Sequence, residues 1–159
     1  MQMREDLHIA GRLTLRKTTL DGQLVEEVTA HNEITLAGRD LIARLFRNDQ
    51  QNVKIGRVTK MLVGRSQAPF DAKQTALVDK VAETPITNGT EPLGEVPDTN
   101  GRTRKMLRLI GELGENDAND ALREAGLFTE DNVMYNRVTF DTVTKSKQFK
   151  LTLVWEILF

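Results

Sequence analysis

The chain has 159 residues, with 22 lysines and arginines against 23 aspartates and glutamates, so its formal net charge is −1. This balance gives no bulk electrostatic reason to expect nucleic acid or an anionic membrane as a partner. The lack of cysteine excludes disulfide scaffolds, thiolate metal sites and cysteine nucleophiles. The length is typical of one core, and we predict a single domain over 1–159.

The chain begins with residues 1–6, which are acidic and lack the basic head and apolar run of a secretion signal. No stretch approaches the roughly 20 apolar residues that span a bilayer. We therefore expect a protein that is made in the cytoplasm and has no membrane partner. Residues 1–6 are predicted to form an N-terminal arm at an interface, with a frayed terminus as the alternative.

The first predicted elements form a β-hairpin. Residues 7–16 alternate apolar and polar side chains with the period of two that a half-buried strand requires. The dipeptide Asp21-Gly22 favours a tight turn, and residues 23–30 resume an extended pattern.

A helix over about 36–47 follows, because Thr35 can cap it and the apolar side chains become spaced by three and four. We expect this amphipathic helix to cover one face or end of the sheet. Its apolar stripe would consist of Leu41, Ile42, Leu45 and Phe46.

Residues 57–64 predict another strand between two glycines. The stretch 65–101 contains all four prolines and several glycine turns, so we predict a long irregular loop region with turns around short extended pieces. A long excursion inside a compact domain is typically functional, mobile or held by a partner. We expect 65–101 to be an interface element, with a plain surface loop as the alternative.

The C-terminal residues carry the clearest strand pattern, because every odd position from Phe149 to Phe159 is large and apolar. Such a strand must lie inside a sheet or against another subunit, with Trp155 in the core. The basic turn Lys145-Ser146-Lys147 joins it to the preceding strand.

We predict a mainly β fold, an antiparallel β-sandwich of about seven strands and one helix. The predicted strands cover 7–16, 23–30, 57–64, 102–113, 121–128, 133–143 and 149–159.

Residues that could bind a metal ion are few. His8 and His31 are the only histidines, and both are better interpreted as surface or hinge residues. An oxygen-rich turn resembles a calcium loop but lacks its glycine and distal glutamate, so a solvated turn is favoured. That turn contains Glu115, Asp117, Asn119 and Asp120.

No enzyme signature is present. Ser66 and Ser146 lie in predicted turns with no histidine near in sequence, and no pair of carboxylates is fixed across a cleft. The segment 111–114 has neither the glycine spacing nor the lysine of a phosphate-binding loop. We predict that the chain is not an enzyme and has no catalytic, cofactor-binding or metal-binding residue.

The strongest basic cluster could contact phosphate, because alternate positions of a strand share a face. No aromatic residues are interleaved with it, so an ordinary solvent face or a salt-bridged subunit contact is favoured and nucleic acid is not expected. The cluster consists of Arg102, Arg104, Lys105 and Arg108. Sugar recognition is equally disfavoured, since the chain has one tryptophan and one tyrosine, Tyr135.

Five short strings, taken in order, resemble small structural proteins of tailed bacteriophages and are similar to components of contractile injection systems. The resemblance covers most of 31–159 and depends on the order and spacing of ordinary β-protein segments. The strings are His31-Asn32-Glu33-Ile34-Thr35, Met61-Leu62-Val63-Gly64, Glu124-Ala125-Gly126-Leu127-Phe128, Asn136-Arg137-Val138-Thr139-Phe140 and the closing 151–157.

The resemblance implies a non-enzymatic virion protein, an oligomeric adaptor in the tail, neck or collar, baseplate or fibre attachment region. Expected partners are other copies in a symmetric ring or fibre and other virion structural proteins, through extended arms and sheet edges. The alternative function is a host-surface glycan-binding module of a tail fibre, dependent on residues 85–101.

Overall fold

A computed structural model describes residues 8–47, 56–87 and 93–159. Within these residues the chain forms ten strands and one helix, which confirms the mainly β fold class with a single helix. The elements are β1 (Ala10–Thr19), β2 (Leu24–His31), β3 (Glu33–Ile34), α1 (Leu36–Arg47), β4 (Val58–Gly64), β5 (Lys80–Thr87), β6 (Leu93–Pro97), β7 (Thr103–Leu113), β8 (Ala121–Thr129), β9 (Asn136–Thr144) and β10 (Phe149–Leu158).

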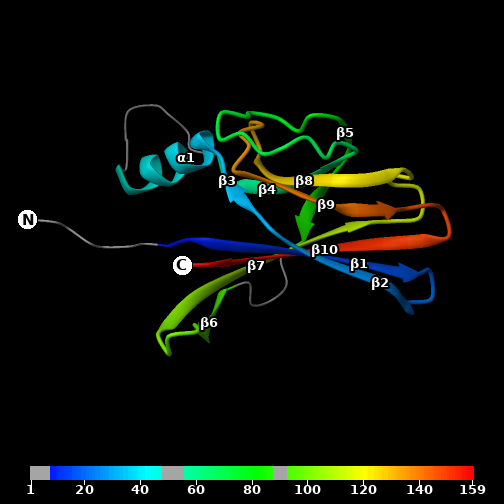
Figure 1. Ribbon diagram of the computed structural model, residues 1–159, viewed down its shortest axis with the longest axis horizontal. Coiled ribbons are helices and arrows are strands. Elements are labelled where there is room, and N and C mark those ends of the chain that lie inside the picture. The colour runs from blue at the N-terminus through cyan, green and yellow to red at the C-terminus, as the bar shows by residue number, and fades with distance from the viewer. Residues whose placement is uncertain (1–7, 48–55, 88–92) are drawn as a thin grey trace, which may run out of the picture.

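The strands follow one antiparallel hydrogen-bonded path that folds over into two layers (Figure 1). The lower layer has the order β2-β1-β10-β7, with β6 also paired to β7, and the upper layer has the order β5-β4-β8-β9-β3. Two segments pass between the layers. β5 pairs first with β4 and then, at Ile86 and Thr87, with β7. β2 continues through Asn32 into β3, which pairs with β9.

The core lies between the two layers, and β10 contributes to it as its alternation predicts. Leu151, Leu153 and Trp155 have no exposed surface, and Ile157 is 4% exposed. The Trp155 indole Nε1–H donates a hydrogen bond to Oδ1 of Asn32 at 2.9 Å, so its polar atom is paired. β10 pairs with β1 on one side and β7 on the other, and therefore lies in the middle of the lower layer.

The strand count differs from the prediction mainly because the predicted loop region 65–101 contains β5 and β6. Prolines usually argue against a strand, since they lack an N–H for the ladder. Pro85 is the last residue of β5 that pairs with β4, one position before the strand turns to β7. Pro97 ends β6, which is an edge strand. Both prolines therefore occupy positions where an amide donor is not needed.

Helix α1 begins as predicted. Oγ1 of Thr35 accepts a hydrogen bond from the backbone N–H of Gly38 at 2.9 Å and donates one to the carbonyl of Met134 at 2.7 Å. A Cβ at Gly38 would lie 2.0 Å from the carbonyl oxygen of Tyr135, so only glycine permits this approach. The helix therefore starts against the segment before β9 and lies at one end of the sandwich (Figure 1).

A buried ion pair joins two neighbouring strands of the upper layer. Glu124 on β8 and Arg137 on β9 have fully buried side chains, and Oε2 lies 2.8 Å from Nε. The same carboxylate accepts the backbone N–H groups of Val78 and Asp79 at 3.1 and 2.7 Å. A Cβ at Gly64 would lie 2.5 Å from Oε1 of Glu124, so the carboxylate fits only beside glycine.

This ion pair also holds the connection 65–79 against the outer side of the upper layer. Nη1 of Arg137 donates a hydrogen bond to the carbonyl of Ala68 at 2.9 Å. Further along the connection, the carbonyl of Ala72 accepts the backbone N–H of Leu36 at 2.8 Å, at the first residue of α1. The connection therefore links the ion pair to the start of the helix.

We predict that Arg137→Leu lowers the free energy of unfolding by roughly 3–5 kcal/mol, because it leaves the Glu124 carboxylate buried without its cation. Arg123→Leu on β8 is the matched control, since Arg123 is only half-buried and bonds to Thr142 and to a backbone carbonyl. It should cost less than about 1 kcal/mol. Urea unfolding of both variants measures the difference, and equal losses would contradict the prediction.

Glu156 on β10 links the two strands beside it in the lower layer. It lies opposite both Arg12 on β1 and Arg108 on β7, with carboxylate–guanidinium distances of 2.6 and 3.1 Å. Desolvation raises the pKa of the carboxyl, but the hydrogen bonds and charges of the two arginines outweigh it, so the pKa lies below 4.5. This contribution to stability is therefore present above pH 4.5 and is lost as the pH falls through the lowered pKa.

We expect Glu156→Gln to lower stability at pH 7 by about 1 kcal/mol and the difference from the parent chain to vanish in acid. Urea unfolding between pH 7 and about pH 3 measures this. Glu27→Gln is the control, because the pair of Glu27 with Arg16 has both side chains about half exposed. A difference that persisted unchanged at the lowest pH would refute the assignment.

Candidate functional site: an apolar groove beside the helix

An apolar groove of about 380 Å³ opens at the helix end of the sandwich, and we refer to it as the α1 groove. One wall is α1, and the remaining lining residues come from strands of both layers and from Ile9 and Phe159, which flank the lower-layer strands β1 and β10. The lining residues are Ile9, Leu41, Ile42, Leu45, Phe46, Val58, Leu107, Leu109, Leu127, Tyr135, Ile157 and Phe159.

The floor of the groove belongs to the core, whereas its rim does not. Leu127 and Ile157 are 0% and 4% exposed, while Leu45 and Phe46 are 60% and 81% exposed. The predicted apolar stripe of the helix is thus buried only in its first half. Isolated exposed apolar residues are ordinary, but a contiguous exposed apolar surface marks an interaction site.

Tyr135 is the only residue with a polar side chain in the described lining of the groove. Burial raises the pKa of its phenol, and the nearby Arg39 opposes this only in part. The phenol therefore stays neutral at neutral pH, and the lining offers apolar contact area rather than acid–base chemistry.

The structure does not bring the two histidines together. His8 and His31 are both exposed, and the β1–β2 register places His31 opposite Arg12, four residues along the chain from His8. At the rise of a strand, four residues correspond to about 13 Å. Within the described residues, no group of three or more His, Cys, Asp or Glu side chains is arranged to hold a metal ion.

The oxygen-rich turn before β8 binds the ammonium group of Lys145, which comes from the connection between β9 and β10. Lys145 is 2% exposed, and its ammonium donates to Oδ1 of Asn119 at 2.8 Å and to the carbonyl of Glu115 at 3.4 Å. Burial lowers the pKa of Lys145, and the carboxylates of Asp117 and Glu115 oppose this. The predicted basic turn Lys145-Ser146-Lys147 does connect β9 to β10, and Lys145 within it is a buried structural residue.

The serines and the basic cluster also make local contacts. Oγ of Ser66 accepts the N–H of Ala68 at 3.0 Å, as in an ordinary turn. In the basic cluster, Lys105 pairs with Glu95, Arg108 pairs with Glu156, and Arg104 donates to the carbonyl of Phe159 at 3.1 Å. These contacts lie within the chain, and the predicted subunit contact of the basic cluster stays a prediction.

Sequence reasoning missed the α1 groove, although the strongly apolar end of the helix pattern at Leu45 and Phe46 was the signal for it. The interface role predicted for 1–6 falls outside the described residues, as does 88–92 within the predicted interface element 65–101.

The chain matches no protein-family model, no curated protein and no solved structure. Within its described residues, no helix is long and apolar enough to cross a membrane.

We predict that the rim of the α1 groove is not needed for folding. Phe46→Ser should change the free energy of unfolding by less than about 0.5 kcal/mol, because the side chain is exposed. Leu41→Ala, on the same helix face but 9% exposed, should cost about 2–5 kcal/mol. Urea unfolding compares the two variants, and a loss at Phe46 as large as that at Leu41 would show that the ring is buried in solution.

Proposed function

We propose that this chain is a non-enzymatic structural protein of a tailed-bacteriophage particle, which acts as an oligomeric adaptor in the tail, neck or collar, baseplate or fibre attachment region. It is located in the virion and binds other virion proteins and copies of itself. The phage context comes from the resemblance of its sequence segments, and the manner of action comes from the geometry of its surface.

The observation that carries the proposal is the α1 groove. Helix α1 exposes Leu45 and Phe46 to solvent beside the buried apolar floor of the groove. This exposed apolar surface is suited to contact with another chain. Transferring this surface from water on association would contribute roughly 25 cal/mol for each Å² buried.

The remaining surface supports the same function. β2 and β6 are the edge strands of the lower layer, and each lacks a second neighbour among the described strands. Such edges can accept a strand from another chain. The charged residues that could have formed a reactive cluster are engaged in ion pairs and turns within the chain. The surface is therefore suited to association.

Mass spectrometry of purified particles tests the proposal. Peptides of this chain should copurify with intact, gradient-purified particles in a fixed ratio to the major tail proteins across independent preparations. A soluble host protein, quantified in the same fractions, measures carry-over from the lysate. Presence of the chain in the lysate together with its absence from intact particles would reject the proposal.

A further inference from the structure

We propose that the α1 groove receives the tip of the β1–β2 hairpin of a second copy of the chain, in a head-to-tail contact. This inference rests on the proposed function, because it names the partner that covers the groove. The hairpin tip is defined here as residues 18–25.

The hairpin tip exposes three apolar side chains. Leu20 in the turn is 44% exposed, and Leu24 and Val25 at the start of β2 are each 51% exposed. Gly22 has a φ of 96°, and the Thr19 N–H donates to the carbonyl of Gln23 at 2.8 Å. The tip is thus preorganised by its own hydrogen bonds, and binding would cost little additional ordering of the backbone.

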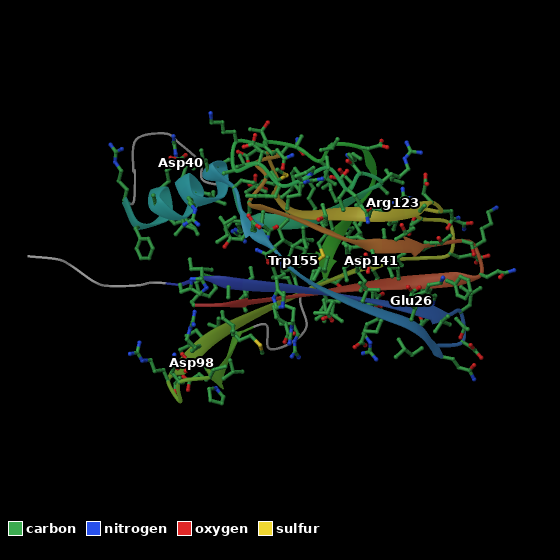
Figure 2. All side chains as sticks on the ribbon, in the orientation of Figure 1. Glu26, Asp40, Asp98, Arg123, Asp141 and Trp155 are labelled. Atoms are coloured by element: carbon green, nitrogen blue, oxygen red, sulfur yellow. The ribbon has the colours of Figure 1, made fainter. Side chains whose placement is uncertain are left out.

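The hairpin tip and the α1 groove lie at opposite ends of the molecule. In Figure 1 the turn between β1 and β2 is at the right, whereas α1 and the C-terminus are at the left. Figure 2 shows the same separation for Glu26 on β2 and Asp40 on α1. A contact between different surfaces at opposite ends is heterologous, and its repetition generates a ring or a filament.

Charge favours this pairing over contact between two grooves. Helix α1 carries three arginines against Asp40, a net charge of +2. The hairpin over 16–27 carries Arg16 and Lys17 against Asp21, Glu26 and Glu27, a net charge of −1. A symmetric groove-to-groove dimer would bring two positive helices together, whereas the hairpin brings the opposite charge to the helix.

The contact is small. Three aliphatic side chains and a turn cover less than the roughly 800 Å² per partner that a stable isolated interface buries. We therefore expect a single contact to be weak and assembly to depend on concentration or on closure of a ring, in which every copy makes two contacts.

Directed disulfide cross-linking tests the inference, because the chain has no cysteine of its own. Leu24→Cys and Phe46→Cys are made as separate full-length variants, one of them with a size tag, and are mixed under mild oxidation. The mixture should form a disulfide-linked heterodimer at least about ten times faster than either variant forms a homodimer, since docking raises the local thiol concentration. A chain with both cysteines should form a ladder of higher multimers.

Lys73→Cys replaces Leu24→Cys in the control mixture, because Lys73 is exposed on the connection 65–79, away from the hairpin tip. Unfolding midpoints within error of the parent chain confirm that each variant is folded.

A heterodimer that forms no faster than this control overturns the proposed docking. If the chain is nevertheless a component of purified particles, the structural function stands and the groove binds another virion protein. Rapid heterodimer formation by a chain absent from particles would instead support the docking and reject the phage role.

Discussion

The buried ion pair between Glu124 and Arg137 is the interaction on which the arrangement of the upper layer depends. It binds β8 to β9, and through the amides at 78 and 79 and the carbonyl at 68 it fixes the connection 65–79 on the outer surface. That connection in turn contacts the first turn of α1 through Ala72. The buried ion pair therefore supports the start of the helix through this connection, in addition to the direct contacts of Thr35 with Met134.

The same region explains why the two layers differ in character. Beneath the connection lies a second apolar cluster, separate from the main core, formed by Leu62, Leu77, Phe128 and Met134. β8 is consequently buried on both faces, whereas β10 is buried on one face and partly exposed on the other. In the upper layer the connection 65–79 covers β8, whereas β5 and β9 keep exposed side chains. The lower layer has exposed side chains on its outer face and has β2 and β6 at its edges.

How much of this could be predicted from the sequence depended on whether the information was local. The alternation of 149–159 correctly assigned every inward residue of β10, and Thr35 correctly marked the start of α1, because both patterns follow from backbone geometry. β5 was missed because the position that makes Pro85 acceptable is defined by two strands remote in sequence. The burial of Glu124, Arg137 and Lys145 was equally hidden, since charged residues are assigned to the surface unless their partners are known.

The central place of β10 in the lower layer has a consequence for how the chain acquires its structure. This strand is synthesised after the nine other described strands, yet β1, the first of them, pairs with it along its full length. Contacts so remote in sequence require closure of nearly the whole chain and make folding slow. Until residues 149–158 leave the ribosome, β1 and β7 lack the strand that pairs with both of them. Their apolar side chains are then accessible to aggregation and to chaperones.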